Sequence, residues 1–120
     1  MSMFQLREDH MNAFQETALE NFQDRGVRYL RSQLPNETAD YSDDQLRQRV
    51  RECVARAQPY GLTSERQVMS FAVVTYISGE NFDTSADCDW APAVLQNPDY
   101  TGDVKAAVLI SFAYSRGGPA

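Results

Sequence analysis

The segment from Val68 to Ile77 constrains the fold more than any other part of the chain, because it is apolar on almost every side. Its composition would also suit a β-strand, but apolar and polar residues do not alternate along it. Ser64 and Gln67 precede it at the spacing of a capping box, in which two side chains bond each other's backbone amides at a helix start. Gly79 follows as a natural helix stop. We therefore predict a helix, and a helix that is apolar all round belongs at the centre of a bundle.

Two long helices are expected before this central one. The first is predicted from about Arg7 to Gln33, because apolar residues recur at helical spacing. Leu34-Pro35 ends it, since the residue before a proline avoids the α conformation. The second is predicted to begin near Ser42, a good N-cap followed by acidic residues. It ends before Pro59 and Gly61.

One short helix and one long helix are expected after the central one. The short helix is predicted to begin with Asp89 as its cap and Pro92 in its first turn, and to close at Asn97-Pro98. The last helix is predicted from about Thr101 to Ser115, with an apolar stripe of Val104, Val108, Leu109 and Phe112. The predicted fold is therefore a single all-α domain over residues 1–120, a bundle of four main helices plus one short helix. Residues 116–120 are predicted to be a tail.

Gly26 and the arginines indicate how the helices pack. Gly26 interrupts the first helix at a cost of about 1 kcal/mol relative to Ala, so we expect another helix to approach closely there. The sequence has ten Arg and one Lys, Lys105. Because Arg forms bidentate, partly buried ion pairs better than Lys, some arginines are expected in a structural network. Arg49 and Arg56 are predicted on a polar face of the second helix.

Composition limits the class of partner. The net charge is −6 over 120 residues, whereas a general nucleic-acid binder needs a basic face that displaces counterions. The charge favours a basic protein partner. The first residues lack the pattern of a signal peptide, no segment is long and apolar enough to span a bilayer, and two cysteines are too few for a disulfide framework. We expect a cytoplasmic protein with reduced thiols that binds neither nucleic acid nor membrane; a homodimer is compatible with the sequence.

Catalytic and metal-binding patterns are not found in the sequence. His10 is the only histidine and lies near one end of the sequence without a nucleophile motif elsewhere. Together with two distant cysteines it does not give a zinc site. Cys53 lies on an apolar stripe and is expected to be inert core, whereas Cys88 is expected to be exposed in a loop. We predict no enzyme activity, no cofactor and no metal.

The loop of residues 83–89 places oxygen ligands at alternate positions, as a calcium site does. However, Cys88 stands where an EF-hand loop needs glycine, and Val94 stands where it needs a bidentate acid. Helix capping and solvation explain these acidic residues better than calcium binding.

Aromatic residues near helix ends suggest a contact surface, because exposed Trp and Tyr are typical binding anchors. The candidate protein-binding residues are Tyr60, Phe82, Asp83, Asp87, Asp89, Trp90 and Tyr100. If Trp90 is such an anchor, Trp90→Ala should weaken partner binding more than it lowers the melting temperature. The alternative is that Phe82 and Trp90 fold the loop back onto the bundle.

Five stretches of the sequence resemble a family of small bacterial proteins. They are residues 6–14 (LREDHMNAF), 22–25 (FQDR), 60–66 (YGLTSER), 82–84 (FDT) and 90–91 (WA). The resemblance extends over nearly the full length. Members of this family tend to be encoded beside spike, tip and effector genes of type VI secretion systems.

The resemblance implies a protein-binding role. Such gene neighbours include adaptors or chaperones that load effectors, and immunity proteins that neutralise them. We therefore expect an accessory protein that binds an effector or spike component, with an immunity protein as the alternative and a stand-alone enzyme disfavoured. The part after Tyr100 resembles the family least, which would place partner choice in the last helix.

Overall fold

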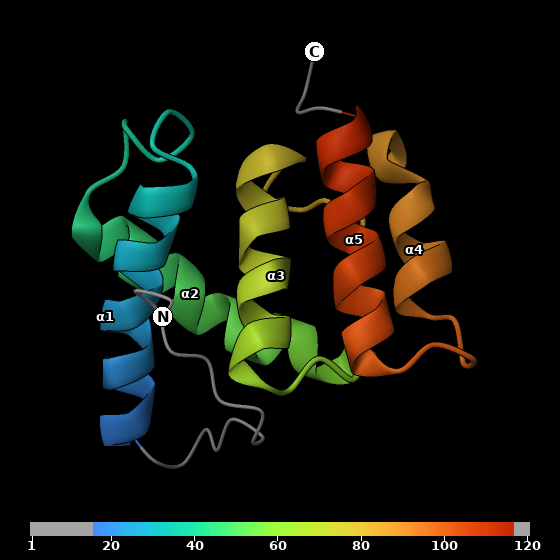
Figure 1. Ribbon diagram of the computed structural model, residues 1–120, viewed down its shortest axis with the longest axis horizontal. Helices are drawn as coiled ribbons and strands as arrows, with labels where there is room; N and C mark the ends of the chain where they lie inside the picture. Colours follow the sequence, from blue (N-terminus) through green and yellow to red (C-terminus); the bar gives the residue numbers. More distant parts are fainter. Residues whose placement is uncertain (1–15, 117–120) are drawn as a thin grey trace.

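The helix predicted at the centre of the bundle, α3, lies between α1 and α2 on one side and α5 on the other (Figure 1). The computed structural model describes residues 16–116. In that range the protein forms four long helices and one short one, with no strand: α1 (Glu16–Gln33), α2 (Asp43–Ala57), α3 (Glu65–Ile77), α4 (Trp90–Leu95) and α5 (Gly102–Arg116). Two 3₁₀ turns, Gln58–Tyr60 and Ala86–Cys88, precede α3 and α4. The predicted all-α fold of four main helices plus a short one is confirmed.

Local sequence signals set the ends of α2 and α3 as predicted. Ser42 caps α2, accepting from the Gln45 amide at 3.1 Å while its own amide donates to the Gln45 side chain at 2.8 Å. The same reciprocal pair joins Ser64 and Gln67 at the start of α3. Gly79 follows α3 with a φ of +118°, a left-handed conformation that favours glycine. Capping satisfies amides that the helix itself leaves without partners.

Gly26 allows α1 to pack closely on its neighbours, as predicted. A Cβ atom at this position would lie 3.1 Å from Val50 Cγ2 on α2 and 3.3 Å from Met69 Sδ on α3. The contact therefore joins three helices in the core, where Val50 and Met69 are almost fully buried. The missing side chain compensates for the low helix propensity of glycine.

Arginines form the expected structural network. Six ion pairs lie in the described residues: Arg25–Glu65, Arg31–Asp43, Arg47–Asp24, Arg49–Glu80, Arg51–Glu16 and Arg56–Asp83. The predicted polar face of Arg49 and Arg56 is wrong, because that face of α2 turns toward α3. Arg49 stacks on Tyr76, with its Cζ 4.4 Å from the ring centroid, and Arg56 stacks on Phe71 at 5.3 Å. Their apolar stems and planar guanidinium groups cover aromatic rings.

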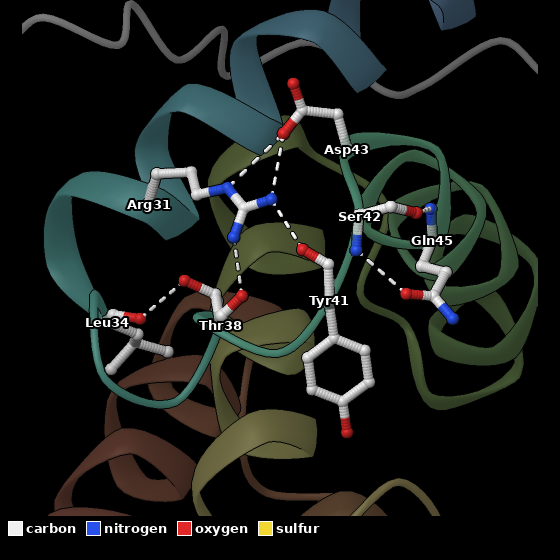
Figure 2. Close-up of polar contacts among 7 residues, drawn as sticks. All are labelled: Arg31, Leu34, Thr38, Tyr41, Ser42, Asp43 and Gln45. Carbon is white, nitrogen blue, oxygen red and sulfur yellow. Dashed lines mark hydrogen bonds and ion pairs between the residues drawn. The ribbon is translucent and has the colours of Figure 1, made fainter.

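Arg31 fastens the loop between α1 and α2 (Figure 2). Its guanidinium donates to the carbonyl oxygens of Thr38 and Tyr41 and to the Asp43 carboxylate. The buried Thr38 hydroxyl donates back to the Leu34 carbonyl at 2.7 Å. The Tyr41 side chain points away from Arg31 (Figure 2), and its ring meets the Tyr76 ring edge-on at 5.4 Å. The loop therefore holds Tyr41 against α3.

Four predicted details differ from the structure or lie outside it. Asp89 does not cap α4 with its side chain, because its backbone is already helical (φ −63°, ψ −21°), and Ser85 instead caps the preceding 3₁₀ turn. Val104 is 41% exposed, because α5 buries Ala106, Leu109 and Ala113. The predicted start of the first helix and the tail beyond residue 116 lie outside the described residues.

Candidate functional site

Phe82 and Trp90 belong to the core, so their predicted place in a contact surface is wrong. Phe82 is 0% exposed and Trp90 is 8% exposed. Phe82 packs on Phe71 of α3 at 4.9 Å between ring centroids, and Trp90 stacks between Phe82 at 6.1 Å and Phe112 of α5 at 5.3 Å. The alternative is therefore correct: the loop after α3 folds back onto the bundle. The physical reason is the large apolar area that stacked aromatic rings remove from water.

Tyr60 and Asp83 hold this loop in place. The Tyr60 hydroxyl donates to one Asp83 oxygen at 3.0 Å, and Arg56 donates to the other at 2.7 Å. The Asp83 side chain is only 9% exposed. Burial, together with the hydrogen bond to Asp83, raises the pKa of Tyr60. Because Lys105 also donates to the Tyr60 carbonyl at 2.9 Å, these residues connect α2, the loop and α5, and their polar groups are used internally.

The remaining predicted contact residues are exposed but are not brought together. Asp87 and Asp89 precede α4, whereas Tyr100 follows it and is 37% exposed. The segments that precede and follow α4 lie toward opposite ends of this helix (Figure 1). The seven candidate residues therefore do not form one surface.

Both cysteines are free and buried. Cys53 is fully buried, as predicted, but the predicted exposure of Cys88 is wrong, because it is 6% exposed and its thiol donates to the Ser78 carbonyl. Burial, and then the neighbouring Asp87 and Asp89, raise the pKa of Cys88. Within residues 16–116 no group of three or more His, Cys, Asp or Glu side chains could hold a metal ion. His10 lies outside that range.

The buried Cys53 thiol should make stability sensitive to alkaline pH. Burial raises its pKa from 9.0 to about 12, so the folded protein keeps the thiol protonated where the unfolded protein ionises it. Its contribution to stability is present below pH 9 and is lost as the pH rises from 9 toward 12. We expect the difference in unfolding free energy between wild type and Cys53→Ala to shrink between pH 8 and pH 10.5 in urea titrations. A pH-independent difference would contradict this.

A groove between α1 and α5, with α3 as its floor, is the best candidate contact surface in the described residues. It has a volume of about 280 Å³. We call it the α1–α5 groove. Its lining residues are Tyr29, Gln33, Arg66, Met69, Ser70, Val73, Ile110 and Tyr114.

The α1–α5 groove has an apolar floor and a mixed rim. Met69 and Val73 form the buried floor, Tyr29 and Ile110 are half-buried walls, and Tyr114 is 57% exposed. Partial burial raises the pKa of Tyr114, with smaller effects from Tyr29 and from Glu37. Like any tyrosine of ordinary or raised pKa, Tyr114 is neutral near pH 7, and its hydroxyl can donate or accept a hydrogen bond.

A second hollow of about 310 Å³ lies at the edge of α1 and α2, lined by Asp24, Val27, Arg28, Asp43 and Arg47. It is mostly charged. Arg47 pairs with Asp24 across it, and Asp43 pairs with Arg31. Its lining has no aromatic side chain, whereas the α1–α5 groove is lined by Tyr29 and Tyr114, so the α1–α5 groove is the stronger candidate for a protein contact.

Comparison with protein-family models, with curated proteins and with solved structures gives no match for this protein. Within the described residues, no helix has the length and apolar character needed to cross a membrane.

Proposed function

We propose that this protein is a non-enzymatic accessory protein of a type VI secretion system, an adaptor or chaperone that binds a secreted effector or a spike component through the α1–α5 groove. The resemblance of residues 6–14, 22–25, 60–66, 82–84 and 90–91 to small proteins encoded beside such components supports the assignment to secretion. The net charge of −6 suits a basic partner that must be kept soluble before export.

The composition of the groove is the observation that carries the proposal. Tyr, Met and Arg are enriched at protein–protein interfaces, and the groove combines Tyr29, Met69, Arg66 and Tyr114 around one apolar floor. Tyr114 is the most exposed of the large apolar side chains in the described residues. Hot spots of binding are often Tyr, Trp or Arg at the centre of such a surface.

The partner should be identified by affinity purification of the tagged full-length protein from its native host, followed by mass spectrometry. We expect an effector or spike component of the secretion system. Recovery of specific partners that include no secretion component would contradict both the adaptor and the immunity interpretation.

Tyr114→Ala tests the groove once that partner is known. Because hot-spot truncations cost about 2 kcal/mol or more, we expect Kd to rise about 30-fold, with little change in melting temperature because Tyr114 is exposed. Tyr100→Ala, which removes an exposed tyrosine beyond α4, is the matched control and should leave Kd nearly unchanged. The reverse result would move the contact surface to the α4–α5 connection.

Deletion of the gene separates the two roles. For an adaptor, deletion should lower the stability or secretion of the effector, and sibling cells should not kill the deletion strain. Killing of the deletion strain by sibling cells, with normal effector secretion, would assign the protein as an immunity protein instead.

A further inference from the structure

A cationic side chain is buried against two tyrosine rings where the α1–α2 loop meets α3. Arg49 of α2 is 9% exposed. Its Cζ lies 4.4 Å from the ring centroid of Tyr76 and 5.9 Å from that of Tyr41. The two rings meet edge-on, and the loop that carries Tyr41 is fastened by Arg31 (Figure 2). The guanidinium is therefore held in one orientation by its neighbours.

Donors outnumber acceptors around this guanidinium. Arginine carries five N–H donors, yet in the described residues Arg49 donates one hydrogen bond, to the Thr75 hydroxyl at 3.1 Å. The nearest carboxylate, Glu80, is 3.8 Å away, which is beyond hydrogen-bond distance. Nearby, the buried Tyr76 hydroxyl has no hydrogen-bond partner within the part of the protein that is described. No nitrogen of Arg49 is among the buried atoms without a partner in the described residues, so its other donors reach water. An added carboxylate would replace this water with charge-assisted hydrogen bonds.

The position of Glu80 shows how an acceptor can reach Arg49. The Glu80 carboxylate lies 3.8 Å from Arg49 Nη2. The Arg49 side chain is only 11% exposed, whereas the Glu80 side chain is 57% exposed. That side of the guanidinium is therefore open to water through the place that Glu80 occupies. An external carboxylate can take the same place and form the short, bidentate pair that Glu80 does not form.

We propose that Arg49, flanked by Tyr41 and Tyr76, is a binding site for a carboxylate group of a partner protein, and that Glu80 occupies it loosely in the free protein. The site does not depend on the α1–α5 groove, because the two share no residue. The net charge of −6 does not oppose it, since charges more than about 8–10 Å away are largely screened at physiological ionic strength. A planar guanidinium stacked on aromatic rings is well suited to a planar carboxylate.

The test uses the full-length ¹⁵N-labelled protein and NMR. N-acetylglycine mimics the C-terminal carboxylate of a protein, and N-acetylaspartate amide mimics an acidic side chain. We expect at least one of them to shift the Arg49 Nε–Hε signal saturably, while sodium chloride at equal ionic strength does not. The probe that binds more tightly identifies the source of the carboxylate. Inorganic phosphate binding more tightly than both would overturn the carboxylate assignment.

Glu80→Gln is the decisive variant. Removing an internal competitor of this kind should tighten probe binding about two- to fivefold. Glu20→Gln makes the same charge change on the exposed face of α1 and should leave the affinity unchanged. Arg49→Lys, which keeps the charge but loses the planar fork, should weaken binding at least tenfold. If Glu80→Gln lowers the unfolding midpoint and no probe shifts Arg49 in either form, the Arg49–Glu80 contact is purely structural and the proposal is wrong.

Discussion

Replacing Trp90 by alanine is expected to lower the free energy of unfolding by about 3–5 kcal/mol, the usual cost of truncating a large buried aromatic side chain. Trp90 stacks on both Phe82 and Phe112, so its removal leaves a cavity where the loop, α4 and α5 meet. Urea denaturation followed by far-UV circular dichroism measures the loss. It replaces the smaller effect on stability that was expected for the case in which Trp90 is an exposed binding anchor.

Tyr100→Ala is the control for this experiment. Tyr100 follows the same short helix but is 37% exposed, and surface substitutions usually change stability by no more than about 0.5 kcal/mol. A Trp90→Ala protein as stable as Tyr100→Ala would mean that the loop does not pack on the bundle in solution.

Arg25→Met is expected to lower the free energy of unfolding by about 2–3 kcal/mol. The Arg25 guanidinium donates two hydrogen bonds to the Glu65 carboxylate, Nη1 to Oε1 and Nη2 to Oε2, each of 2.8 Å. The Glu65 side chain is only 5% exposed. Removing Arg25 takes both of these hydrogen bonds from a buried carboxylate, and breaking a fully buried ion pair costs about 3–5 kcal/mol. Glu65 stands in the first turn of α3, where the helix dipole favours a negative charge. Because the dipole partly stabilises the carboxylate, we expect a loss in unfolding free energy of about 2–3 kcal/mol, at or below the lower end of that range.

A double variant identifies the cause of this loss. Arg25→Met combined with Glu65→Met leaves no buried charge, so it should recover most of the stability. If the double variant is as unstable as Arg25→Met, the loss comes from packing and not from the charge. Arg51→Met, whose pair with Glu16 lies on the exposed surface, should leave the urea midpoint almost unchanged.

The structure shows which kinds of sequence signal were reliable. The N-cap predicted at Ser42 and the capping box predicted at Ser64 are both present, because each depends on residues three positions apart and little on the rest of the protein. The cap predicted at Asp89 was wrong, although the signal was also local. Ser85 four residues earlier already starts a 3₁₀ turn, and the backbone reaches Asp89 in a helical conformation. Two capping signals, Ser85 and Asp89, therefore lie close together in this loop, and the folded structure uses Ser85.

Neither the burial of the predicted contact residues nor the α1–α5 groove could be obtained from the sequence. An aromatic residue in a polar loop has the same pattern whether it faces water or the core, so Phe82 and Trp90 could not be assigned. The groove combines residues as distant as Tyr29, Met69 and Tyr114. No spacing rule connects such positions, because they become neighbours only when α1 and α5 both pack on α3.

The sequence by itself determined the helices, the central place of α3 and the close packing at Gly26, because each depends on short-range spacing or on the size of one residue. The tertiary structure decided how α3 is surrounded. It placed Phe82 and Trp90 in the core, packed Arg49 against Tyr76 and Tyr41, and left a groove beside Tyr114. The physical reason is that burial depends on contacts between distant segments, and these are fixed only when all the helices compete for the same apolar faces.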